Sequence, residues 1–153
     1  MQAVEAKCYD NMVYLLEKGA DVNKQNKLGE TALMYAIHNN HVDSALLLLN
    51  KGADVNKQNE LGETALMLAI ANNDKILMIK LILLGATLPE SSNELFTILK
   101  QNQRYNDILA FFKKMINFTN ESKTNKNLLQ LQIKINAITN ILVPRLQKEE
   151  ELN

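Results

Sequence analysis

The 153-residue sequence lacks tryptophan and contains only one cysteine, four phenylalanines and four tyrosines. The single cysteine, Cys8, cannot form an intramolecular disulfide, which excludes a disulfide scaffold and fits a reducing compartment. Hydrophobic residues still make up 46% of the chain, which is enough for a core. Because leucine, isoleucine, valine, methionine and alanine supply most of that fraction, the composition is suited to stacked helices.

The sequence also lacks an excess of charge of either sign. Its 17 lysine and arginine residues balance 17 aspartates and glutamates, and its pI is about 6.7. Nucleic-acid-binding domains usually present a strongly basic surface, so we predict no nucleic-acid partner. The glycines form no phosphate loop, and the cysteine and two histidines lack ligand spacing, so we predict no cofactor and no metal site.

Long hydrophobic runs are absent as well. The longest candidate, Ile76 to Leu84, is interrupted by Lys80 and is far shorter than the roughly 18 residues of a membrane-spanning helix. The first residues, MQAVEAKCYDN, have no basic segment followed by an apolar core, so they do not resemble a secretory signal. We therefore predict no membrane span and a cytoplasmic location.

The choice among polar residues is strongly biased. Lysine outnumbers arginine 15 to 2, and asparagine occurs 20 times. Such a bias is typical of an AT-rich coding sequence, and it points to an intracellular bacterium, a parasite or a large virus as the source.

The most informative feature that is present is a repeated block of 22 residues. Residues 19–40 read GADVNKQNKLGETALMYAIHNN, and residues 52–73 read GADVNKQNELGETALMLAIANN. The two blocks lie 33 residues apart and agree at 19 of 22 positions, so chance does not explain them. A fixed period of this length indicates a stacked repeat architecture.

Each copy predicts a turn followed by two helices. Gly29 suits a tight turn, and Thr31 can cap a helix over about 32–39 through its hydroxyl group. Two asparagines then end that helix, because asparagine tolerates the left-handed conformation of a short turn. A second helix is expected over about 42–50, with Gly52 just beyond its end.

Downstream of the repeats, residues 119–127 are polar and predict a linker, and a last amphipathic helix is expected over about 127–143. Pro144 should end or kink that helix. Its apolar stripe has three interpretations: it folds back over the last repeat, pairs with a partner helix or with itself, or lies on a membrane.

The predicted organisation has two parts. Residues 1–117 form a repeat array, made of a partial or capping repeat over 1–25, repeats over 26–58 and 59–91, and a degenerate repeat over 92–117. Residues 118–153 form the linker and the C-terminal helix.

The motifs within the repeats resemble those of ankyrin repeat proteins. Residues 29–36 and 62–69 carry G-x-T-A-L-M-x-A, and residues 19–23 and 52–56 carry G-A-D-V-N. The chain departs from the family pattern where alanine replaces the family proline and methionine replaces the family histidine. The resemblance implies an all-α fold, an ankyrin-type repeat solenoid of helix-turn-helix pairs with hairpin-like turns, to which the C-terminal amphipathic helix is added.

The resemblance also implies how the chain functions. Such arrays bind proteins through the turn tips and the inner face of the first helices, and function depends on the exposed positions. Leu28 and Leu61 are expected to be exposed near the two tips, where each either anchors a partner or packs against the next turn. The three differences between the two blocks fall on or beside this surface, as expected of a binding surface or of drift on an unconstrained one. By position, the partner-binding residues are Lys27, Leu28, Glu30, Tyr35, His38, Asn39, Glu60, Leu61, Glu63, Leu68, Ala71 and Asn72.

No catalytic residues are predicted, since Cys8, His38 and His41 lack a partner carboxylate and an oxyanion loop. We interpret the chain as a non-catalytic protein-protein interaction module, in the setting of an effector secreted into a host cytosol without a classical signal peptide. Two alternatives stay open: the regulatory or targeting portion of a longer enzyme, and a self-assembling structural protein. A monomer is expected, and a dimer through the C-terminal helix is the alternative.

Overall fold

The structure, a computed structural model, describes residues 2–88, 105–121 and 126–150. Its helices are α1 (Gln2–Glu17), α2 (Ala32–His38), α3 (Val42–Asn50), α4 (Ala65–Ala71), α5 (Lys75–Leu83), α7 (Tyr105–Glu121) and α8 (Lys126–Glu150). Within these ranges there is no strand, only an isolated bridge between Gln25 and Thr31. The predicted all-α repeat solenoid with a C-terminal helix is therefore confirmed. No described helix has the length and hydropathy needed to cross a membrane.

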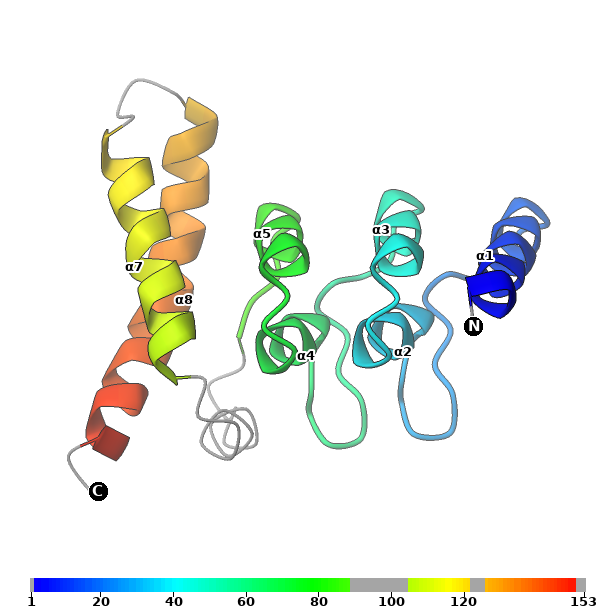
Figure 1. The fold of residues 1–153 in the computed structure, drawn as a ribbon, viewed down its shortest axis with the longest axis horizontal. Coiled ribbons are helices and arrows are strands. Elements are labelled where there is room, and N and C mark those ends of the chain that lie inside the picture. Colours follow the sequence, from blue (N-terminus) through cyan, green and yellow to red (C-terminus); the bar gives the residue numbers. More distant parts are fainter. Residues whose placement is uncertain (1, 89–104, 122–125, 151–153) are drawn as a thin grey trace.

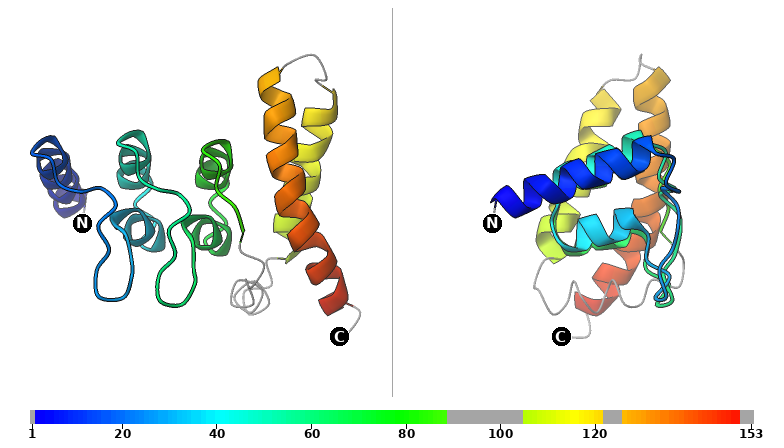
Figure 2. Two further views of the ribbon diagram at one scale, coloured as in Figure 1. Left: turned by 180° about the vertical axis from the view of Figure 1, so that it is seen from behind. Right: turned by 90° about the vertical axis from the view of Figure 1, so that its right-hand side faces the viewer.

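The repeats form parallel layers. Figure 1 shows α1, α3 and α5 in one row, α2 and α4 in a second row, and the long loops extending beyond the second row. Helix α2 pairs with α3, α4 pairs with α5, and α2 packs directly on α4. Viewed along the stack, the helices of successive layers overlie one another (Figure 2). Each layer therefore buries apolar side chains between its own two helices and against its neighbours.

The inner helices begin where the sequence predicts. The hydroxyls of Thr31 and Thr64 accept hydrogen bonds from the backbone N–H groups of Met34 and Met67, at 3.2 and 3.3 Å. Both threonines are buried, so each cap satisfies a backbone donor that water cannot reach. At the other end of α2, Asn40 has a φ of 57°, which is the left-handed turn expected of asparagine there.

Asparagine side chains connect each layer to the next. The Oδ1 atom of Asn23 accepts a hydrogen bond from the Asp54 N–H at 2.7 Å. One repeat later, Oδ1 of Asn56 accepts from the Thr87 N–H at 2.9 Å. Because these contacts recur at the repeat spacing, they fix the register of successive layers as well as adding stability.

Gly29 allows the two tips to approach closely. Its φ is +73°, and a Cβ atom there would lie 2.9 Å from the Glu60 N atom and 3.0 Å from the Asn59 Cα atom. Gly62 occupies the same place in the next repeat, with a φ of +77°, but a Cβ atom there would meet nothing within 4 Å. The two glycines therefore share a conformational requirement and differ in their steric surroundings.

This difference predicts the outcome of a matched pair of alanine substitutions. Gly62→Ala should cost about 1–2 kcal/mol of unfolding free energy, because a side chain is strained at positive φ. Gly29→Ala should cost roughly 1–3 kcal/mol more, because the neighbouring backbone must also move. Urea denaturation followed by circular dichroism measures both losses. Equal losses would show that the close approach of the tips contributes nothing.

The C-terminal helices are longer than expected. Helix α7 continues to Glu121, so residues 119–121 of the predicted linker are helical, and α8 runs through Pro144 to Glu150 instead of ending near 143. Packing of α7 along α8 outweighs the low helix propensity of the polar residues. Pro144 is exposed, so water can reach the backbone carbonyl that the proline leaves unpaired. The proposed degenerate repeat over 92–117 stays a prediction, because residues 92–104 lie outside the described part.

The α7–α8 pair covers the α4–α5 repeat. Helix α8 packs against α5, and Nζ of Lys134 donates a hydrogen bond to the Leu83 carbonyl oxygen at 2.8 Å, at the end of α5. Ile135 and Ile138 of α8 are buried in the same apolar cluster as the repeat core. Of the three interpretations of the C-terminal stripe, the structure has the one in which it folds back over the array. Leu83 and Leu84 nevertheless stay about half exposed.

Candidate protein-binding surface

The tip of each repeat is built around one asparagine side chain. Oδ1 of Asn26 accepts hydrogen bonds from the N–H groups of Leu28 and Glu30, both at 2.9 Å, and its Nδ2 donates to the Glu30 carboxylate at 3.0 Å. Asn59 makes the same three contacts with Leu61 and Glu63. Each asparagine therefore holds the backbone of its own turn through contacts within the same repeat.

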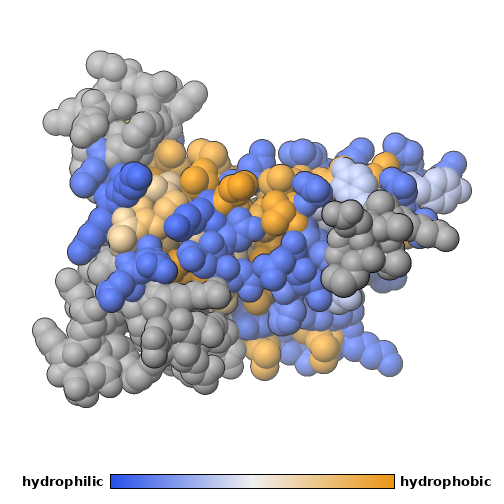
Figure 3. All heavy atoms as spheres, viewed as in Figure 1, coloured by the Kyte–Doolittle hydropathy of each residue, from blue (hydrophilic) through white to orange (hydrophobic). Residues whose placement is uncertain are grey.

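These turns hold two leucines outward. Leu28 is 60% exposed and Leu61 is 66% exposed, as expected from the sequence. The tips are adjacent, because the Glu60 N–H donates to the Leu28 carbonyl oxygen at 3.1 Å. Figure 3 shows this edge of the molecule as mostly hydrophilic, with separate apolar spots. Apolar side chains surrounded by polar ones are suited to be contact anchors.

The remaining tip residues divide into two kinds. Lys27 and Glu60 are exposed at equivalent positions with opposite charges, so they are available to a partner. Glu30 and Glu63 are partly buried, and their carboxylates are already paired with the asparagine amides. Glu30 and Glu63 therefore maintain the shape of the tips.

The inner helices differ although their sequences are nearly the same. Tyr35 of α2 is 60% exposed, whereas Leu68, its counterpart on α4, is 8% exposed. Helix α2 covers α4, and no described helix covers α2 in the same way, as the end-on view shows (Figure 2). Leu68 was expected on the binding surface, and in this structure it is buried in the core instead.

The residues at the ends of the two inner helices also differ, because those of α2 are exposed and those of α4 contact other residues. His38 and Asn39 of the first repeat are exposed. In the second repeat, Nδ2 of Asn72 donates to the Ile37 carbonyl oxygen at 2.6 Å, so this side chain ties one layer to the other. Ala71 is partly buried and has contacts of its own. We call the exposed set the tip-and-α2 surface: Lys27, Leu28, Tyr35, His38, Asn39, Glu60 and Leu61.

Within the described ranges, no group of three or more histidine, cysteine, aspartate or glutamate side chains is placed to hold a metal ion. The tip-and-α2 surface is therefore characterised by apolar anchors, amides and single charges. These groups are suited to noncovalent recognition of another surface.

Comparison with known families agrees with this geometry. Residues 1–91 match the family model for ankyrin repeats in three copies, which is more than half of the 153-residue chain. The match ends before α7 begins, so the α7–α8 pair lies outside it. No curated protein matches the chain. The resemblance inferred from the repeated blocks is confirmed.

Proposed function

Because the chain belongs to the ankyrin repeat family, whose repeats are generally non-catalytic protein-protein interaction modules, we propose that it binds a partner protein through the tip-and-α2 surface. The observation that carries this proposal is the exposure of Leu28 and Leu61 on adjacent, internally fixed tips. A turn that needs no partner to keep its shape presents its leucine without an ordering cost on binding. Tyr35 adds an exposed aromatic anchor on the free face of α2.

Two surface changes test this function. The double variant Leu28→Arg with Leu61→Arg should weaken partner capture by the intact chain on the order of a hundredfold or more, since interface anchors contribute about 2 kcal/mol or more each. Quantitative affinity capture followed by mass spectrometry measures the loss. The melting temperature should hardly change, because both side chains are exposed.

Leu129→Arg is the matched control. Leu129 is 51% exposed on α8, away from the tips, so the same chemical change there should leave capture unaltered. A partner that the double variant and the control retain equally well would refute the assignment of the tips. Turnover of a substrate by the chain alone would refute the non-catalytic proposal.

A finer proposal concerns the biological setting. The excess of lysine and asparagine supports an AT-rich source, and we propose an effector that acts on a host protein in the host cytosol. The base composition of the gene tests the first step, and a GC-rich gene removes the argument. Localisation of the tagged chain in infected cells tests the second step.

A further inference from the structure

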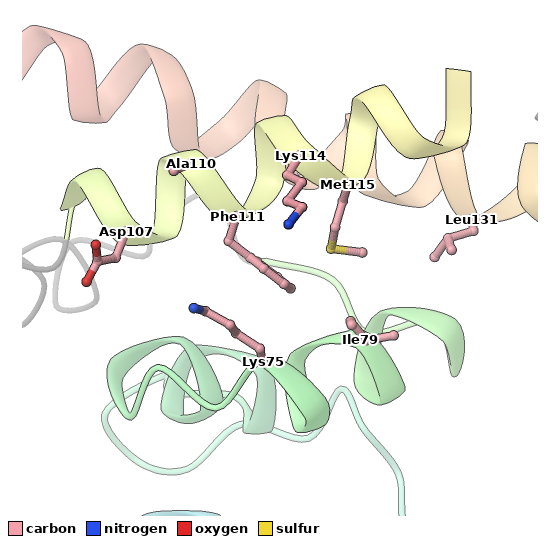
Figure 4. A pocket seen from close by; sticks show the side chains of 8 residues that line it. All are labelled: Lys75, Ile79, Asp107, Ala110, Phe111, Lys114, Met115 and Leu131. Carbon is pink, nitrogen blue, oxygen red and sulfur yellow. The ribbon is translucent and has the colours of Figure 1, made fainter. Parts of the chain in front are cut away.

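A groove lies between the α4–α5 repeat and the α7–α8 pair, apart from the tip-and-α2 surface. Its volume is about 650 Å³. Figure 4 shows Lys75 and Ile79 of α5 pointing towards Phe111, Lys114 and Met115 of α7 across this space. Small-molecule sites usually measure roughly 300–1,000 Å³, so the groove has the size of a ligand site. Its lining residues are Lys75, Ile79, Asp107, Ala110, Phe111, Lys114, Met115 and Leu131.

The walls of the groove are mainly apolar and incompletely covered. Phe111, Met115 and Leu131 pack against the core cluster but are only partly buried. The Phe111 ring is positioned by Phe112, whose ring lies edge-on to it with centroids 5.6 Å apart. An apolar ligand in the groove would remove this remaining surface from water, which is favourable.

The groove is lined by more positive than negative side chains. Nζ of Lys75 lies 6.0 Å from the centre of the Phe111 ring, and Lys114 points into the same space from α7 (Figure 4). Within the described part of the chain, neither lysine forms an ion pair. Asp107 is the one carboxylate among the lining residues, so the lining carries an excess of one positive charge. This balance favours a ligand with a single negative charge over a polyanion.

We propose that this groove binds an apolar carboxylate. The alkyl or ring portion occupies the space beside Phe111 and Met115, and the carboxylate is held by the ammonium groups of Lys75 and Lys114. An ammonium group and a carboxylate form a charge-assisted hydrogen bond, which is stronger next to apolar walls than in water. The site is formed by residues of α5 together with those of the α7–α8 pair, and it is separate from the proposed protein-binding surface.

Two probes that differ in charge test the proposal on the full chain. Decanoate should displace the anionic dye 1-anilinonaphthalene-8-sulfonate in a saturable manner, on the order of tenfold more effectively than uncharged decanol does. The double variant Lys75→Gln with Lys114→Gln should lower the affinity for decanoate on the order of tenfold and leave that for decanol unchanged, because glutamine keeps most of the aliphatic chain.

Two further variants identify the site. Lys113 neighbours Lys114 but does not line the groove, so Lys113→Gln should bind decanoate as the unaltered chain does. Ala110 is exposed and lines the groove, so Ala110→Phe should fill the space and weaken decanoate and decanol alike without lowering the melting temperature. Equal binding of decanoate and decanol, or unchanged decanoate binding by the double lysine variant, overturns the proposal. The proposal is also overturned if a protein partner displaces the dye and decanoate does not.

Discussion

Phe112→Ala should lower the free energy of unfolding by about 3–5 kcal/mol, the largest loss that we expect from a single substitution. Phe112 is 1% exposed and belongs to the same apolar cluster as the repeat core. It stands on α7, outside the part of the chain that matches the repeat family. A large loss measured by urea denaturation would therefore show that the C-terminal pair is an integral part of the folded unit.

Phe111→Ala is the internal control for this prediction. It removes the same ring from the next position of the same helix, but Phe111 is only partly buried beside the groove. Its loss should be on the order of 1–2 kcal/mol, which includes the edge-to-face contact with Phe112. Equal losses for the two variants, or separate transitions for the repeats and the α7–α8 pair, would contradict a shared core.

The repeated part of the fold is predictable because the sequence contains nearly the same block of 22 residues twice. Thr31 and Thr64 cap their helices in the same way, and Asn40 and Asn73 have φ values of 57° and 58°. These features depend only on residues near them in the sequence, so the 22-residue block predicts them in both copies. The exposure of Leu28 and Leu61 follows similarly, because each turn fixes its own shape through Asn26 or Asn59.

Features that depend on the neighbouring layer are not predictable in this way. Tyr35 and Leu68 share a position in the repeat, but among the described helices an inner helix packs only over Leu68. Asn72 looks like a surface residue in the sequence, yet its amide bonds the Ile37 carbonyl of the preceding repeat. A repeated sequence predicts the contacts that its copies share, and within the described residues α2 and α4 differ in the helices that cover them.

The groove has no signal in the sequence at all. Its lining combines residues of α5, α7 and α8, and the last two helices belong to no repeated block. The residues beside Lys114 in the sequence do not indicate that it faces Lys75 and Ile79 of α5 across the groove. The same limitation explains the helix ends at Glu121 and beyond Pro144, where packing between α7 and α8 outweighs local propensity.

Leu66→Ala should cost about 2–5 kcal/mol of unfolding free energy, because the cavity that it leaves is closed on all sides. Leu66 has 0% exposure on α4, the inner helix that packs against both α2 and α5. Layers of a solenoid are stabilised chiefly by their contacts with adjacent layers, so a defect in this layer weakens the coupling in both directions. Marginally stable domains have only about 5–15 kcal/mol in total, so a loss of this size should be visible as a large decrease in melting temperature.

Leu61→Ala is the control that separates the cost of a cavity in the core from the cost of removing any leucine side chain. Leu61 lies in the same repeat as Leu66 but is 66% exposed, so its removal should change stability by no more than about 0.5 kcal/mol. The contrast between the two sites tests the stacked arrangement itself, because both substitutions remove the same atoms. If Leu66→Ala costs less than about 1 kcal/mol, α4 is not enclosed between neighbouring helices, and the rigid tips that carry the proposed binding surface lose their support.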